Sequence, residues 1–235
     1  MNQQPTGAVV IFVKTPGLSP VKTRLGNSIG KQAAEAFHLL SAASVEAVVK
    51  KTQLKLPCSI TPYWAVAEEA ALTHPAWQGF VPIHQGTGEL GARLARVYQS
   101  LLAKHAFVIL LGADSPQLSP QILGQAIEGL DHSEFVLGKA DDGGFYLFGG
   151  KIPVSTGIWT QIPYSASNTS DVLTKLLRPT GNIRELPPLF DVDTVKELSL
   201  LTAHLQTQRD LLPAQKSLLE WLATLPTLIE DKPHA

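Results

Sequence analysis

Continuous apolar runs, rather than alternating ones, mark the predicted strands of this chain. Residues 8–13 read AVVIFV and residues 107–112 read FVILLG, so each run consists only of apolar residues and glycine. A strand that helices cover on both faces has this continuous pattern, which is typical of parallel sheets. An acid, Asp114, follows the second run, and Ser119-Pro120 then supplies an N-cap residue and a first-turn proline that predict a helix start.

Segments with helical spacing of apolar residues alternate with these runs. Residues 31–50 place Phe37, Leu40 and Val48 along one helical face. Further strands are predicted over residues 60–67, 80–84, 135–137, 145–148 and 182–186, and further helices over residues 68–72, after the turn at 85–91, and over 121–130, 170–177, 195–205 and 214–225. The alternation predicts βαβ units with right-handed crossovers. Because no repeat or Gly/Ser-rich linker divides the chain, we expect a single-domain, three-layer α/β/α fold with a mainly parallel, Rossmann-like sheet.

Composition narrows the class of protein. Of the 235 residues, 44% are hydrophobic and 17% are charged, which supplies a large core and argues against disorder. The net charge of −1 argues against general nucleic-acid binding. The only cysteine is Cys58, so no intrachain disulfide or thiolate metal cluster is expected. No apolar run reaches the length of a membrane span, and the N-terminus lacks the features of a signal peptide. The simplest expectation is a soluble cytoplasmic protein.

The loop after the first predicted strand, residues 14–25, is rich in proline and glycine, and its only charged residues are Lys14, Lys22 and Arg24. Phosphates bind at this edge of α/β sheets, and fixed cations stabilise the charge of a polyphosphate. The alternative is a solvated basic loop without a ligand. The loop lacks the dinucleotide fingerprint G-x-G-x-x-G, and it lacks the glycine that precedes the lysine of a P-loop.

Five acids lie in turns at the ends of predicted strands: Asp114, Asp141, Asp142, Asp191 and Asp193. Proteins hold Mg²⁺ with one or two carboxylates, completed by substrate phosphates and water. Asp114 and Asp193 are therefore predicted to form such a site. Two alternatives remain open at this point: Asp114 could cap its own turn, and Asp191 or Asp193 could cap the helix that begins near residue 195.

Two glycine-rich turns complete the candidate chemistry. Residues 141–144 read Asp-Asp-Gly-Gly, and their glycines allow a ligand to approach the backbone, although a plain hairpin turn would use the same residues. Gln85-Gly86 opens a second turn before a predicted helix. No histidine pair has zinc-ligand spacing, and no G-x-S-x-G nucleophile motif is present.

Taken together, five motifs resemble one family: residues 14–25, 85–91, 112–116, 138–149 and 191–194. It is the bacterial family of provisionally assigned glycosyltransferases named selenodomain-associated transferase 1, within the GT-A-like nucleotide-diphospho-sugar transferase superfamily. The resemblance covers residues 8 to 198. It implies one nucleotide-diphospho-sugar transferase-like domain over residues 1–235, with a nucleotide-binding half over 8–113, an acceptor half over 114–198 and C-terminal helices over 195–225.

The resemblance also implies roles for individual residues. Lys22, Arg24 and Asp114 would be catalytic, and Asp114 and Asp193 would hold Mg²⁺ or Mn²⁺. The acceptor would lie against Asp142, Gly143 and Gly144. Nucleotide binding would involve Lys14, Gly17, Lys22, Thr23, Arg24, Gln85 and Gly86.

The leading hypothesis is a Mg²⁺-dependent glycosyltransferase that uses a nucleotide-activated donor and a small-molecule acceptor. The second hypothesis is a nucleotidyltransferase that joins an NTP to a phosphorylated metabolite and releases pyrophosphate. A third is a nucleotide sensor that keeps the fold without catalysis. The expected partners are a nucleotide or nucleotide sugar and a small-molecule acceptor, with no nucleic acid and no membrane span; a homodimer remains an open alternative.

Overall fold

A seven-stranded sheet forms the centre of the protein. The computed structural model describes residues 6–55 and 59–226. The strands are β1 (Gly7–Val13), β2 (Ile60–Val66), β3 (Val81–His84), β4 (Phe107–Gly112), β5 (Phe135–Lys139), β6 (Phe145–Gly150) and β7 (Ile183–Glu185). They are arranged in the order β3-β2-β1-β4-β6-β5-β7. All neighbouring pairs are parallel except those of β6, which runs antiparallel to both β4 and β5.

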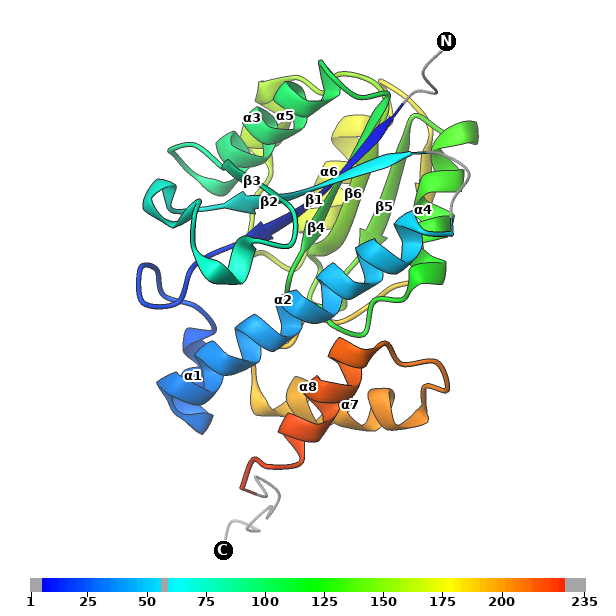
Figure 1. The fold of residues 1–235 in the computed structure, drawn as a ribbon. Coiled ribbons are helices and arrows are strands. Elements are labelled where there is room, and N and C mark those ends of the chain that lie inside the picture. The colour runs from blue at the N-terminus through cyan, green and yellow to red at the C-terminus, as the bar shows by residue number, and fades with distance from the viewer. Residues whose placement is uncertain (1–5, 56–58, 227–235) are drawn as a thin grey trace, which may run out of the picture.

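Helices cover both faces of this sheet (Figure 1). The long helix α2 (Lys31–Gln53) and α4 (Pro120–His132) lie on one face, while α3 (Leu90–Leu102), α5 (Thr156–Gln161) and α6 (Thr169–Leu177) lie on the other. The short helix α1 (Thr23–Ile29) precedes α2, and α7 (Val195–Thr207) and α8 (Pro213–Leu222) follow the last strand. The 3₁₀ turns η1 (Glu69–Ala71) and η2 (Pro75–Trp77) lie between β2 and β3.

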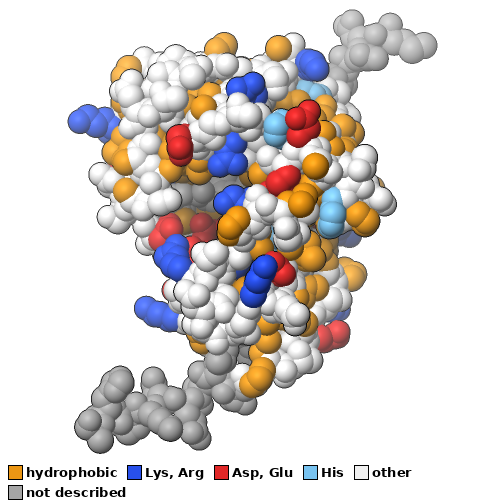
Figure 2. All heavy atoms as spheres, turned by 90° about the vertical axis from the view of Figure 1, so that its left-hand side faces the viewer, with side chains coloured by type: hydrophobic (Ala, Val, Ile, Leu, Met, Phe, Trp, Pro, Cys, Tyr) orange, Lys and Arg blue, Asp and Glu red, His pale blue; other side chains and the backbone are white. Residues whose placement is uncertain are grey.

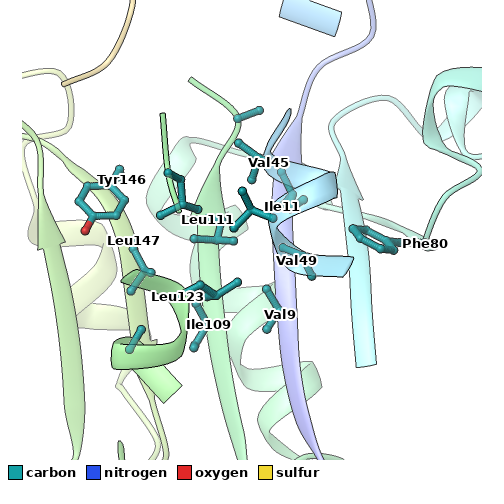
Figure 3. Packing of buried hydrophobic residues seen from close by; sticks show 14 of the residues in the cluster. Val9, Ile11, Val45, Val49, Phe80, Ile109, Leu111, Leu123, Tyr146 and Leu147 are labelled. Atoms are coloured by element: carbon teal, nitrogen blue, oxygen red, sulfur yellow. The ribbon is translucent and has the colours of Figure 1, made fainter. Parts of the chain in front are cut away.

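The continuous apolar runs are buried because alternate residues enter different cores. Val9 and Ile11 of β1 pack with α2 and α4, whereas Ala8 and Val10 pack with α3. Figure 3 shows the first of these cores, in which Val45 and Val49 of α2 lie over Ile11 and Val9. Each fully buried side chain of this size stabilises the fold by about 1.5–3 kcal/mol relative to its exposed state.

A third cluster joins the C-terminal helices to the N-terminal part of the chain. Leu201 and Leu205 of α7 and Leu218 of α8 pack against Leu25 of α1 and Phe37 of α2. The two C-terminal helices therefore lie beside α1 and α2, far from them in the sequence (Figure 1). No helix in the described ranges is both long enough and apolar enough to cross a membrane.

The fold confirms the predicted class, a single-domain α/β protein with a mainly parallel sheet. The predicted strands and long helices are present, and Ser119 caps α4 as expected by accepting a hydrogen bond from the Ile122 amide at 3.2 Å. Two short helices went unpredicted. Residues 23–25 were expected to lie in a loop and residues 26–29 were assigned no element, but residues 23–29 form α1. Residues 156–161 were likewise assigned no element but form α5. Each of these helices has only one buried residue, so neither shows an apolar period. Cys58 lies outside the described residues.

The sheet changes direction of growth between β1 and β4. From β1 the chain adds β2 and then β3 on one side, and α3 then returns it to place β4 on the other side of β1. Open α/β sheets bind ligands outside the carboxyl ends of the strands at such a switch point. The loops that begin at Lys14 and Ala113 flank this position.

Candidate active site

A cleft of about 560 Å³ opens at the carboxyl ends of β1 and β4. Figure 2 views this side of the molecule and shows basic and acidic side chains gathered around a hollow. A volume of this size is typical of small-molecule sites. Its charged lining residues are Lys14, Lys22, Arg24, Arg93, Asp114, Asp142, Asp191 and Asp193.

Lys22 joins two acids from distant parts of the chain. Its Nζ lies 2.8 Å from Oδ1 of Asp114 and 3.0 Å from Oδ1 of Asp193, and only 4% of its side chain is exposed. The residue immediately precedes α1 and has a left-handed backbone, with φ 47°. Arg24 adds a second cation, because its Nη2 donates to Oδ2 of Asp193 at 2.6 Å. Both catalytic cations predicted from the sequence therefore contact the predicted metal-binding acids.

The loop that carries Asp114 is held on three sides. Ser41 of α2 donates a hydrogen bond to the Ala113 carbonyl, and the Val192 amide donates to the Asp114 carbonyl at 3.1 Å. From α8, Nε2 of Gln215 donates to the carbonyls of Pro116 and Leu118 at 2.9 and 3.0 Å. These contacts position the Asp114 loop against the loop that carries Asp191 and Asp193.

The loop after β1 is held by a separate set of contacts. The Thr15 amide donates to Oε2 of Glu68 at 2.9 Å, and the Thr15 hydroxyl accepts from Nε1 of Trp77 at 3.0 Å. Nε2 of His38, on α2, lies 2.9 Å from the Lys14 carbonyl. Because these partners belong to the core, the backbone at Lys14 is fixed although its side chain is exposed.

The charges of the cleft shift several pKa values. The surrounding protein disfavours a charged Asp114, but the Lys22 ammonium outweighs this effect and lowers the pKa of the carboxyl. Burial likewise disfavours a charged Lys22, but Asp114 and Asp193 together raise the pKa of the ammonium. Asp191 lacks a direct cationic partner among the described residues; burial and the nearby charge of Asp114 raise its pKa to about 6. Its Oδ1 accepts from the Ser115 hydroxyl at 2.5 Å.

The acids of the cleft have the chemistry of a Mg²⁺ or Mn²⁺ site, because hard divalent cations prefer carboxylate oxygen. Within the described ranges, no three His, Cys, Asp or Glu side chains are grouped closely enough to hold a metal ion. A metal at Asp114 and Asp193 would therefore need oxygens from a substrate and from water, as Mg²⁺ sites commonly do. It would also share these carboxylates with Lys22.

Gln85, predicted as a nucleotide-binding residue, is bound by the protein itself. Its Nε2 donates to the carbonyls of Val13 and Ala65 at 3.0 and 2.7 Å, and its Oε1 accepts from Nη1 of Arg93 at 2.8 Å. The side chain thus links the carboxyl ends of β1 and β2 to α3, and only 3% of the residue is exposed. Gln85 positions Arg93 in the cleft, and both hydrogens of its side-chain amide are donated to the protein.

The glycine-rich turn between β5 and β6 is packed against a loop before α6. Asp142 accepts from the Gly144 amide at 2.8 Å, and the Gly143 carbonyl accepts from the Ser170 amide at 2.8 Å. Gly143 has φ +90°, and a Cβ there would lie 1.9 Å from the Ser167 carbonyl oxygen. Only glycine fits at this position, and the turn and the 165–169 segment together form one wall of the cleft.

The cleft collects most, but not all, of the site residues predicted from the sequence. Gly17 and Thr23 line a separate hollow on the outer side of the same loop. Gly86 and Gly143 lie next to cleft residues without lining the cleft. The predicted residues that line it are Lys14, Lys22, Arg24, Gln85, Asp114, Asp142, Gly144 and Asp193.

The competing explanations of the acids can now be compared with the geometry. Thr194 caps α7, in a capping box with Glu197, so neither Asp191 nor Asp193 has that role. The carboxylate of Asp114 contacts Lys22, and no backbone amide in the described ranges donates to it. The Lys22 side chain is buried and so is not a solvated surface charge, whereas the Arg24 side chain is exposed but paired with Asp193.

Sequence reasoning missed Arg93 and His38 as cleft residues. Arg93 lies in the first turn of α3, whose Leu94, Val97 and Leu101 indicate a core-facing stripe. One feature of the sequence could have indicated Arg93: it lies two residues after Gly91, the last residue of the glycine-rich turn. His38 is buried in α2, and no local pattern distinguishes it from a core residue.

The family comparison identifies the chain. Residues 28–166 match the family described as uncharacterized proteins conserved in bacteria, DUF2064. The protein belongs to this family. The match includes Asp114, Arg93 and Asp142, whereas Lys22 and Asp193 lie on either side of it. A search of curated proteins found no match.

Solved structures support the fold. A crystal structure from Desulfovibrio desulfuricans G20, of a protein provisionally assigned as a nucleotide-diphospho-sugar transferase, has a TM-score of 0.78 at 24% identity and covers 93% of this chain and 96% of its own. CMP:2-keto-3-deoxy-manno-octonic acid synthetase in complex with CTP gives 0.50 at 14% identity, with 84% and 97% covered. A nucleotidyl transferase from Methanothermobacter gives 0.53 at 16% identity, with 87% and 99% covered. This chain therefore shares the fold of these three structures.

Proposed function

We propose that this protein is a metal-dependent transferase that uses a nucleotide-activated donor, with transfer of a sugar to a small-molecule acceptor as the leading reaction. One observation carries the proposal. Lys22 contacts both Asp114, which follows β4, and Asp193, which precedes α7. All three residues line the cleft at the switch point of the sheet. Such a cleft combines oxygen ligands for a metal with cations for a leaving diphosphate.

In sugar transfer, an oxygen of the acceptor attacks the anomeric carbon of the donor. The bond between that carbon and the diphosphate oxygen breaks, a new carbon–oxygen bond forms, and the acceptor's proton passes to a base. The nucleoside diphosphate leaves with its negative charge. Lys22 and Arg24 stand where they can stabilise that charge by exchanging their carboxylate partners for phosphate oxygens.

Asp114 and Asp193 would hold the metal, Mg²⁺ or Mn²⁺, together with phosphate oxygens. A bound divalent cation supplies Lewis-acid stabilisation of the leaving diphosphate. We assign the region before Asp114 to the donor nucleotide and the turn 142–144, with the segment 165–169 behind it, to the acceptor. A cytoplasmic location remains a prediction from the sequence.

Nucleotidyl transfer is the second candidate, and two of the reported similar structures support it. Two of the similar structures are a synthetase with bound CTP and a nucleotidyl transferase. In this reaction an oxygen of a phosphorylated acceptor attacks the α-phosphorus of an NTP, and pyrophosphate leaves. The same acids and cations would serve either reaction, because both expel a diphosphate group.

A product assay separates the two reactions. The protein is incubated with Mg²⁺ and either nucleotide sugars or NTPs, each with a panel of small hydroxylated and phosphorylated acceptors. Release of nucleoside diphosphate with a glycosylated product supports sugar transfer, whereas steady release of pyrophosphate eliminates it in favour of nucleotidyl transfer. If nucleotides raise the melting temperature but no product forms with any acceptor, the sensor hypothesis replaces both.

A further inference from the structure

The cations of the cleft differ in how their charge is balanced. Lys22 and Arg24 each contact a carboxylate within 3.0 Å. Arg93 lines the same cleft, but within the described ranges no carboxylate lies within 4 Å of its guanidinium group. Arg93 is thus a partly buried cation without a counter-charge.

The orientation of Arg93 is fixed by a buried partner. Its Nη1 donates to Oε1 of Gln85 at 2.8 Å. The side-chain amide of Gln85 cannot rotate freely, because its Nε2 donates to the carbonyls of both Val13 and Ala65. Gln85 is only 3% exposed, so the surrounding atoms also hold its side chain in one conformation. The guanidinium therefore keeps one edge toward Gln85 and its remaining N–H groups free of protein acceptors in the described part of the chain.

One of these free N–H groups is energetically costly. Nε of Arg93 is buried and has no hydrogen-bond partner. An unsatisfied buried donor costs about 1–3 kcal/mol, and a charged donor costs more. Water or a bound group can supply the acceptor that such a donor lacks.

The surroundings would strengthen contact with an anion. Four apolar or aromatic residues also line the cleft: Leu90, Leu94, Phe145 and Tyr164. Apolar walls reduce the local dielectric constant, so charge-assisted hydrogen bonds gain strength there. Lys14, the residue after Val13, is exposed, lines the cleft and also lacks an ion-pair partner among the described residues.

We propose that Arg93, positioned by Gln85, binds an oxyanion of the substrate, either a phosphate or a carboxylate, through the free N–H groups of its guanidinium. The planar fork of arginine suits two oxygens of such a group, and lysine cannot replace it in this geometry. The inference rests on the proposed function in taking this cleft as the substrate site. It assigns the oxyanion to the unpaired Arg93 rather than to the already paired Lys22 and Arg24.

The test compares Arg93→Gln and Arg93→Lys with Arg96→Gln. Arg96 is an exposed arginine on the same helix, outside the lining of the cleft, so its removal changes net charge by the same amount. Isothermal titration calorimetry measures binding of inorganic pyrophosphate, CTP, GTP, the matching nucleosides and malonate to each full-length protein. Thermal melting of every variant checks that the fold is intact.

We expect the parent and Arg96→Gln to bind at least one oxyanion probe with dissociation constants within about twofold of each other. Arg93→Gln should weaken that binding about tenfold or more, which corresponds to about 1.4 kcal/mol. Arg93→Lys should recover only part of it, because lysine keeps the charge without the fork. Loss of nucleotide or pyrophosphate binding identifies a phosphate, whereas selective loss of malonate binding identifies a carboxylate of the acceptor.

Two results would overturn the inference. One is equal binding by Arg93→Gln and Arg96→Gln; the other is a parent that binds none of the oxyanion probes. The proposed function is judged separately by the product assay. If the protein binds pyrophosphate through Arg93 but forms no product, the inference stands and the proposed function is wrong. If the protein forms product and Arg93→Gln binds the probes normally, the proposed function stands and the inference is wrong.

Discussion

The ammonium group of Lys22 lies 2.8 Å from Oδ1 of Asp114. Oδ1 of Asp193 lies 3.0 Å from the same ammonium group. Two acids brought this close need a cation between them, and Lys22 supplies it. Binding of a divalent cation would have to change this arrangement, so Lys22 couples the stability of the fold to occupancy of the site.

Lys22→Met should destabilise the protein by about 1–3 kcal/mol, a value between those of surface and buried ion pairs because the acids are partly exposed. The loss should shrink as the pH falls toward 3. Lys22 lowers the pKa of Asp114, so the pair stabilises the fold above the ordinary pKa of aspartate and loses this effect when the carboxyl is protonated. Urea denaturation at several pH values measures both effects.

Lys31→Met is the matched control, because Lys31 is 83% exposed and its pairing with Glu35 spans 3.8 Å. It should change stability by less than about 0.5 kcal/mol.

Millimolar Mg²⁺ should raise the melting temperature of Lys22→Met more than that of the parent. An equal response in both proteins contradicts a shared position for the metal and the lysine.

Asp114→Asn should abolish Mg²⁺-dependent nucleotide binding and leave the fold intact. The amide keeps the size of the side chain but removes the charge that attracts a divalent cation. Calorimetric titration with nucleotide, with and without Mg²⁺, measures the effect. Asp131→Asn, at an exposed position in α4, serves as control and should bind like the parent. Parent-like, Mg²⁺-dependent binding by Asp114→Asn would remove Asp114 from the metal site.

Gly143→Ala should destabilise the protein by about 2–4 kcal/mol, because it combines a positive φ with a collision against the Ser167 carbonyl. The same change at Gly124 should stabilise it by about 0.5–1 kcal/mol, since Gly124 lies inside α4 with nothing within 4 Å of an added Cβ. Chemical denaturation of the two variants provides the comparison. A Gly143→Ala protein as stable as the parent, or more stable, would show that the turn adjusts freely. The hydrogen bond from the Ser170 amide to the Gly143 carbonyl argues against this outcome.

Between pH 7 and 5, His38 should lower the stability of the protein as the pH falls, whereas Asp191, whose raised pKa favours the folded state at lower pH, should act in the opposite direction. Burial lowers the pKa of the His38 imidazole. The negative charge of Asp114 raises the pKa, and the positive charges of Lys22 and Lys14 lower it further. Below the ordinary histidine pKa of about 6.5, the unfolded chain gains a proton that the folded protein excludes, so unfolding is favoured as the pH falls. His38→Gln should remove the His38 contribution, so the unfolding free energy of the variant should rise relative to that of the parent as the pH falls from 7 to 5. His132→Gln, at the exposed end of α4, should leave the slope unchanged.

The strands were predictable from the sequence because burial on both faces produces uninterrupted apolar runs. Val9 and Val10 illustrate this, since adjacent residues of β1 enter different cores. Helix α1 was not predictable for the opposite reason. Only Leu25 of its seven residues is buried, and Gly26 lies within it, so its stability comes from packing on α2 and α7 rather than from its own pattern.

Apart from Arg93, the charged residues that line the cleft were predictable in their location and chemical type, but their pairings were not. Strand ends and charge signs placed Lys22, Asp114 and Asp193 at one edge of the sheet. Local sequence contains no information that one lysine contacts both acids, because that contact depends on how the C-terminal helices pack. The role of Gln85 depended on the same kind of information: its polar groups are satisfied by two strand carbonyls and Arg93, which only the assembled sheet brings together.

The ion pairs of the cleft join residues that are 171 and 169 positions apart in the chain. Contacts of such long range form late in folding, because the intervening chain must be ordered before its ends can meet. During refolding, the helices and the central strands should therefore recover before the cleft does. Ligand binding then reports arrival at the native topology, and a refolding assay that follows only helix content would register folded protein too early.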